Sequence, residues 1–184
     1  MFHDTCNQNL DTLLPIFDSI SSLKNLDDLL ISKNILLVIK LHPHAKFKKI
    51  NLRNIIYVTN QDLSINNCKL YNFIKNFDSL ITDYSSIFAD YYLLNKPIAF
   101  TTDDMEDYKN NRGFAVTNIN EILAGELIKN ENDFKKFIKN VDSESDDFKQ
   151  ERKSVNKIIN KYSDGNCERL VKLAGIELDS SDHI

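Results

Sequence analysis

Apolar positions along the chain switch between two spacings, and this switching predicts the order of its elements. The run 34–41 is almost continuously aliphatic, which is typical of a central parallel strand buried on both faces. Shorter apolar runs predict three further strands, at 54–59, 79–82 and 98–101. Helical spacing predicts one or two short helices within 10–30 and further helices at 67–77, from the serine pair 85–86 to Leu94, at 130–141, 154–162 and 166–174.

Strands that alternate with helices indicate βαβ units and a parallel sheet. The expected fold class is therefore α/β, with a Rossmann-like parallel sheet flanked by helices and ligands bound beyond the carboxyl ends of the strands. The acidic stretches 102–112 and 142–147 are expected to be a polar loop and a solvated connector. Residues 1–33 are expected to form a helical lead-in, 34–175 the Rossmann-like domain, and 176–184 a disordered tail.

Composition narrows the classes of function that the chain can have. Its 184 residues suit one α/β domain, and a net charge of −4 argues against nucleic acid as a partner. Cys6, Cys68 and Cys167 are far apart and odd in number, which indicates free thiols in a reducing cytoplasm. The N-terminus lacks the features of a signal peptide, and no apolar run approaches the ~20 residues of a membrane-spanning helix.

Glycine is too scarce for the common phosphate-binding loops. The chain has four glycines, Gly113, Gly125, Gly165 and Gly175, and their spacing builds neither a Walker A loop nor a G-x-G-x-x-G turn. Any phosphate would have to be held by hydroxyls, imidazoles and helix N-terminal amides.

The first polar cluster, Lys40 with His42 and His44, follows the aliphatic run. Pro43 stiffens this turn, and two imidazoles on it can donate to phosphate oxygens or stabilise a leaving diphosphate. Strand alternation places Lys40 on the same face as His42. The residues alone also allow a locally hydrogen-bonded strand end or, since a histidine pair can ligate zinc, a metal site; the scarcity of further ligands argues against a metal.

The second polar cluster, Thr82–Ser86, lies between a predicted strand and a predicted helix. Two consecutive serines at a helix start, with Asp83 beside them, can form an anion site because the first helical amides lack intrahelical partners. The same residue types are ordinary helix N-caps, so both interpretations stay open at this point. A serine nucleophile is disfavoured, because no Gly-x-Ser-x-Gly elbow is present.

A third cluster consists of the acidic residues 103–107 and the basic Arg112. The carboxylates can bind Mg²⁺ or ribose hydroxyls, but such runs are more often solvated loops. Arg112 can bind a phosphate with two hydrogen bonds or pair with this acidic stretch.

Several of these motifs, in this order and spacing, resemble the CDP-glycerol:poly(glycerophosphate) glycerophosphotransferases of teichoic acid and capsule synthesis. They are Leu-His-Pro-His at 41–44, Ser-Leu-Ile-Thr-Asp-Tyr-Ser-Ser-Ile-Phe-Ala-Asp-Tyr at 79–91, Lys-Pro-Ile-Ala-Phe at 96–100, Tyr-Lys-Asn-Asn-Arg-Gly-Phe at 108–114 and Asp-Gly-Asn-Cys-Glu-Arg at 164–169. The resemblance spans roughly 35–171.

The resemblance implies the C-terminal, donor-binding half of a GT-B fold that binds CDP-glycerol without a metal or other cofactor. It implies catalytic contacts to the donor diphosphate from His42 and His44, and substrate binding by Asp83, Ser85, Ser86 and Arg112. Lys40, on the same face as His42 by strand alternation, is expected to add positive charge to substrate binding. The polymer acceptor would bind to an N-terminal domain that this sequence does not contain, and the whole protein would be cytoplasmic, at the inner face of the membrane.

The sequence departs from the family pattern after the Arg-Gly-Phe element. Where the family usually has a Pro-Gly-Pro turn, this chain has Leu-Ala-Gly-Glu at 123–126 and keeps only the glycine. Contacts to the base and ribose of the nucleotide therefore do not follow from this turn. Two alternative functions are kept beside that of the family: a GT-B domain that uses a sugar nucleotide, as a glycosyltransferase or epimerase, and a non-catalytic module that binds nucleotide or a partner.

Overall fold

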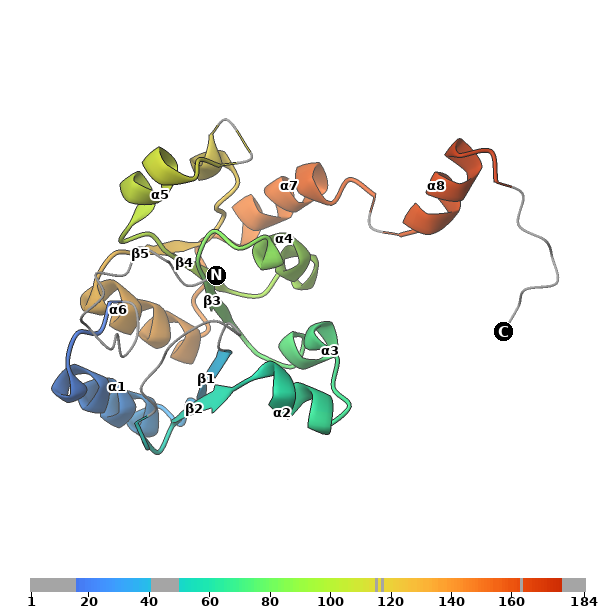
Figure 1. Cartoon of the computed structure of the whole chain (residues 1–184). Helices are drawn as coiled ribbons and strands as arrows, with labels where there is room; N and C mark the ends of the chain where they lie inside the picture. The colour runs from blue at the N-terminus through green and yellow to red at the C-terminus, as the bar shows by residue number, and fades with distance from the viewer. Residues whose placement is uncertain (1–15, 41–49, 115, 117, 163, 177–184) are drawn as a thin grey trace.

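The computed structural model describes residues 16–40, 50–114, 116, 118–162 and 164–176 (Figure 1). Its strands are β1 (Leu37–Lys40), β2 (Ile55–Val58), β3 (Leu80–Thr82), β4 (Ile98–Thr101) and β5 (Glu126–Ile128). Its α-helices are α1 (Ile20–Ser32), α2 (Asn60–Ile65), α3 (Leu70–Ile74), α4 (Ile87–Tyr91), α5 (Met105–Asn111), α6 (Glu131–Asp142), α7 (Lys149–Ile159) and α8 (Asn166–Leu173). Two 3-10 turns, η1 (Tyr92–Leu94) and η2 (Ile119–Glu121), complete the elements.

All strand pairs in the described part of the chain are parallel, as the sequence predicts. β1 pairs with β2, and β3, β4 and β5 form a second sheet in that order. In the second sheet Ile81 lies opposite Ala99, and Phe100 lies opposite Leu127. The three-residue strand β5 was not predicted. The expected α/β class is confirmed.

Helices cover both faces of the strands, because alternate residues of β4 face opposite sides. Ala99 packs into a cluster with α1 and α6, whereas Ile98 and Phe100 pack with α4 and α7. The first cluster also contains Ile39 and Ile81 from the two sheets, so both sheets share one core. The connecting loops leave the strands at their ends (Figure 1), and in folds of this class ligands bind beyond the carboxyl ends of the strands.

Two predictions about burial and secondary structure were wrong. The run 34–41 was expected to be buried on both faces, but in β1 only Ile39 is fully buried; β4 is the doubly buried strand. The stretch 102–112 was expected to be a loop, but most of it forms α5. Met105 and Phe114 pack against the cluster that contains Ile98 and Phe100. The carboxylates of Glu106 and Asp107, in the first turn, interact favourably with the helix dipole.

The acidic connector before α7 was also more than a solvated segment. Asp146 forms a salt bridge with Arg152, whose side chain is fully buried beneath α7. The same guanidinium donates to the carbonyl of Asn95 at 3.4 Å. A buried guanidinium needs such partners. The salt bridge to Arg152 therefore holds Asp146, and with it this part of the connector, in place.

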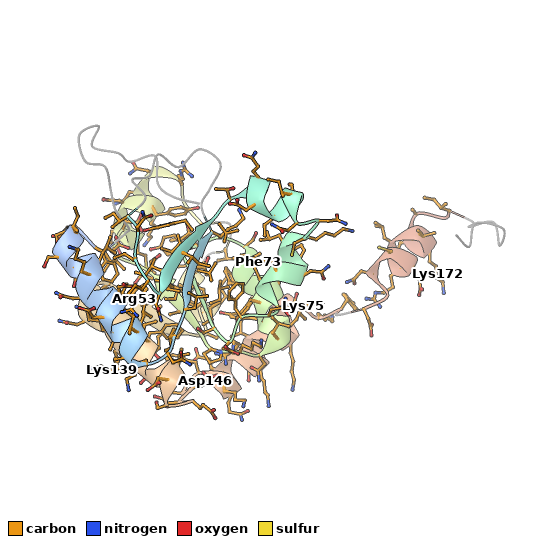
Figure 2. The ribbon with its side chains drawn as sticks, turned by 90° about the horizontal axis from the view of Figure 1, so that it is seen from below. Arg53, Phe73, Lys75, Lys139, Asp146 and Lys172 are labelled. Carbon is orange, nitrogen blue, oxygen red and sulfur yellow. The ribbon has the colours of Figure 1, made fainter. Side chains whose placement is uncertain are left out.

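The last helix, α8, lies apart from the main body, as Lys172 shows in Figure 2. Gly165, with φ of 57°, is its N-cap, which agrees with the predicted start of a helix at 166. No described helix combines the length and apolar character needed to cross a bilayer. The predicted disordered tail includes 177–184, which lies outside the described residues.

Candidate functional site at the end of β3

A hollow of about 250 Å³ lies at the carboxyl end of β3. It is lined by the loop residues Asp83, Tyr84, Ser85 and Ser86, and by Tyr108 from α5. The site therefore combines one continuous loop with a single residue that lies far from it in sequence. Three of the predicted substrate-binding residues meet here.

The loop holds its serines without using their hydroxyls. The amide of Ser85 donates to Oδ1 of Asp83 at 2.9 Å, which closes a tight turn directly after the strand. Ser86 occupies the N-cap of α4, but its side chain makes no capping hydrogen bond. No hydrogen bond joins either serine hydroxyl to the described residues. The plain N-cap interpretation thus fails for the Ser86 hydroxyl, and both hydroxyls can donate to a ligand.

Tyr84 joins the loop to α5. Its hydroxyl donates to Oδ1 of Asp104 at 3.3 Å, and its ring centroid lies 4.8 Å from that of Tyr108 and 5.1 Å from that of Phe114. Burial, and then the nearby carboxylates of Asp104, Asp103 and Asp83, raise the pKa of Tyr84 far above its usual value. The phenol therefore stays protonated, and its hydroxyl remains the donor in the hydrogen bond to Asp104.

A second hollow, of about 380 Å³, lies beyond the ends of β4 and β5. It is lined by Thr102, Asp103, Asp104, Met105, Glu106, Asp107 and Lys129. Within the described ranges no three His, Cys, Asp or Glu side chains are grouped so as to hold a metal ion. The carboxylates can accept hydrogen bonds from ligand hydroxyls, and Lys129 adds one positive charge.

The predicted basic residues have different positions relative to this site. Arg112 follows α5, one turn after Tyr108, and its residue is exposed. Gly113 beside it has φ of 71°, a left-handed conformation that favours glycine. Lys40 ends β1, in the other sheet, and burial lowers its pKa. The two catalytic candidates, His42 and His44, lie outside the described residues.

Sequence reasoning missed Tyr84 and Tyr108 as parts of the site. Tyr84 stands inside the recognised Asp-Tyr-Ser-Ser motif, and Tyr108 begins the recognised Tyr-Lys-Asn-Asn-Arg-Gly-Phe motif. The available signal was helical: Met105 and Tyr108 are three residues apart, the spacing of one helix face. That spacing would have predicted a helix, not a loop, for this acidic stretch, with Met105 and Tyr108 on one face.

Parallel strands with helices on both faces define a Rossmann-like α/β domain, and the polar hollow lies at the carboxyl end of a strand, where ligands bind in folds of this class. The chain belongs to the CDP-glycerol:poly(glycerophosphate) glycerophosphotransferase family, whose model matches residues 16–174. The family expected from the motifs is thereby confirmed, and it is a family of transferases.

Relatives of known function match about half of the chain. A teichoic acid glycerol-phosphate primase of Bacillus subtilis (strain 168) is 37% identical over 89 residues, which are 48% of this chain and 22% of the relative. A teichoic acid ribitol-phosphate primase of Bacillus spizizenii (strain ATCC 23059 / NRRL B-14472 / W23) is 35% identical over 82 residues, 45% of this chain and 20% of the relative. The aligned part thus spans about a fifth of each relative's length.

Among solved structures, the wall teichoic acid polymerase TagF resembles the chain at 21% sequence identity with a TM-score of 0.42. That alignment covers 81% of this chain and 48% of the polymerase chain.

Proposed function

We propose that this chain is the donor-binding domain of a glycerophosphotransferase and that the hollow at the end of β3 receives the diphosphate of CDP-glycerol. The observation that carries the proposal is the pair of serine hydroxyls that make no hydrogen bond to the described residues and line the hollow. The family match over 16–174 supplies the chemical context. Ser85 and Ser86 donate to phosphate oxygens, and Asp83 shapes the turn that presents them.

In the proposed reaction an acceptor hydroxyl attacks the β-phosphorus of CDP-glycerol. The new bond joins the acceptor oxygen to this phosphorus, the bond from the phosphorus to the bridging oxygen breaks, and CMP leaves with the electron pair. The acceptor's proton passes to a base. Since phosphoryl transfer depends mainly on positioning and charge neutralisation, His42 and His44 serve by stabilising the leaving phosphate, with Lys40 and Arg112 as further positive charges.

The whole protein in this proposal has the GT-B architecture, with the acceptor polymer of teichoic-acid or capsule type held by a further domain. The reaction takes place in the cytoplasm, at the inner face of the cell membrane, where the full-length protein associates peripherally. The aligned segment is about a fifth of each curated relative's length, which leaves room in those relatives for a further domain.

Calorimetric titration of the folded chain with CDP-glycerol tests the donor assignment, with UDP-glucose as the matched control. The proposal expects binding of CDP-glycerol and weaker binding of UDP-glucose. The absence of any heat at millimolar CDP-glycerol contradicts it. A preference for UDP-glucose favours the sugar-nucleotide alternative, and a stable dimer that binds neither nucleotide favours the partner module.

A further inference from the structure

One side chain of the loop 83–86, called the serine loop below, makes contacts beyond the turn that Asp83 and Ser85 close. Tyr84 reaches α5 and the residues that flank it through three contacts: a hydrogen bond to Asp104, the N-cap, at 3.3 Å, and ring contacts to Tyr108 and Phe114. Tyr108 and Phe114 also stack on each other, at 5.1 Å and an interplanar angle of 22°. The three rings, Tyr84, Tyr108 and Phe114, form an aromatic cluster at the side of the hollow.

The aromatic cluster holds the loop 83–86 against α5. On the other side of the serines, Phe88 is buried in the core and holds α4 in place. Ser85 and Ser86 therefore lie between two anchors, one in the core and one on α5. A hydrogen bond to a carboxylate is stronger than one between neutral groups, and aromatic contacts of this geometry add to it.

The same contacts join the two hollows. Tyr84 lines the hollow at the end of β3, and Asp104, its hydrogen-bond acceptor, lines the hollow beyond β4 and β5. The linings of the two hollows are therefore linked by one hydrogen bond between side chains.

We propose that Tyr84 is a positioning residue that anchors the loop 83–86 to α5 through Asp104 and the aromatic cluster, and so presents the two serine hydroxyls to the diphosphate. This inference rests on the proposed function for the identity of the ligand. The anchoring itself rests on the contacts of Tyr84 alone.

Three variants of the full chain test this role. Tyr84→Phe keeps the ring contacts and removes the hydrogen bond, Tyr84→Leu removes both, and Tyr71→Phe is the control. Tyr71 is exposed and its hydroxyl also donates to an aspartate, Asp90, at 3.1 Å, so the control loses the same kind of bond outside the site. CDP-glycerol affinity is measured by calorimetry, and thermal unfolding shows whether each variant is folded.

The proposal expects Tyr84→Phe to bind CDP-glycerol about five-fold more weakly, because the lost bond is made to a charged group. Tyr84→Leu should lose more, and Tyr71→Phe should bind as the wild type does. In a double-mutant cycle, Asp104→Ala should add little to Tyr84→Phe. Unchanged affinity in Tyr84→Phe and in folded Tyr84→Leu overturns the positioning role and leaves the donor assignment standing.

Amide hydrogen exchange at Ser85, measured without ligand, separates the two claims. Anchoring predicts faster exchange in Tyr84→Phe than in the wild type, and no change in Tyr71→Phe. If the wild type does not bind CDP-glycerol, the proposed function fails, while faster exchange still establishes the anchoring. Equal exchange in the wild type, in Tyr84→Phe and in folded Tyr84→Leu, which also lacks the ring contacts, overturns the anchoring whatever the ligand is.

Discussion

The phenol oxygen of Tyr92 accepts a hydrogen bond from the amide of Ala124 at 2.8 Å, and the same hydroxyl donates a hydrogen bond to the carbonyl of Ile122 at 2.7 Å. Tyr92 is fully buried, in the turn after α4, whereas Ala124 lies just before β5. The pair thus joins the helix of the serine loop to the segment where the sequence departs from the family pattern. A single side chain satisfies two backbone groups of that segment.

Tyr92→Phe should destabilise the fold by about 1–3 kcal/mol, because the buried amide of Ala124 and the partly buried carbonyl of Ile122 both lose their hydrogen bond to this side chain. The free energy of unfolding, measured in urea, checks this value. Tyr162→Phe is the matched control, since Tyr162 is exposed and should change stability little. Equal stability of Tyr92→Phe and the wild type would contradict the account of this segment.

Tyr92 also predicts a loss of stability at alkaline pH. Burial is the main cause that raises the pKa of Tyr92 from 10.0 to about 12, with the Ala124 hydrogen bond acting against it. The folded state therefore keeps a proton that the unfolded state loses, so this stabilisation is complete below pH 10 and is lost as pH rises toward 12. The stability difference between wild type and Tyr92→Phe should narrow over this window; a constant difference would refute it.

Gly125 should tolerate no side chain. A Cβ there would lie 2.4 Å from the carbonyl oxygen of Ile98 and 2.8 Å from its Cγ2, so the central strand β4 would have to move. Gly125→Ala should cost about 3 kcal/mol or more, at the upper end of overpacking effects. In the control Gly175→Ala the added carbon meets nothing within 4 Å, and only its φ of 66° opposes it. Chemical unfolding that ranks the control as the more destabilised variant would contradict this.

The glycine that survives from the family's turn thus has a packing role. It allows the chain to pass close to β4 before β5 begins, whatever the residues beside it contribute to a nucleotide. This agrees with the sequence-based conclusion that contacts to base and ribose do not follow from the turn alone.

The histidine pair and the serine pair should each contribute to donor binding. His42→Ala, His44→Ala and Ser86→Ala are expected to weaken CDP-glycerol binding by about ten-fold each, the effect of losing one hydrogen bond to a charged group. His183→Ala and Ser154→Ala are the controls; Ser154 is exposed on α7 and bonds only within that helix, to Gln150. Wild-type affinity in all three site variants would remove them from the site.

The sequence predicted the unit of strand, serine loop and helix around 79–94, because a short apolar run, a polar turn and a helical apolar pattern follow one another there. It missed β5, since Leu127 and Ile128 are too few apolar residues to indicate a strand. That strand exists because Thr101 and Phe100 of β4 offer it a partner. Its cause is tertiary, and no local pattern carries it.

The aromatic side of the site was hidden for a similar reason. Tyr84 and Tyr108 lie far apart in the sequence, and their contact depends on where β4 places α5. The surrounding carboxylates hid the helical spacing of Met105 and Tyr108. Both side chains are only half-buried in the folded protein, so the helix has no strongly apolar face in the sequence. The polar residues of the hollow could be predicted from the single motif 83–86. The contribution of Tyr108 could not, because it depends on the tertiary structure.

The most direct test of the diphosphate site is nuclear magnetic resonance of the ¹⁵N-labelled chain titrated with CDP-glycerol. The account predicts that the amide signals of Ser85, Ser86 and Tyr108 shift with ligand concentration and that those of α2 do not. Inorganic pyrophosphate, which lacks cytidine and glycerol, should shift the same two serine amides at higher concentration. Binding that leaves both serine amides unmoved would contradict the account.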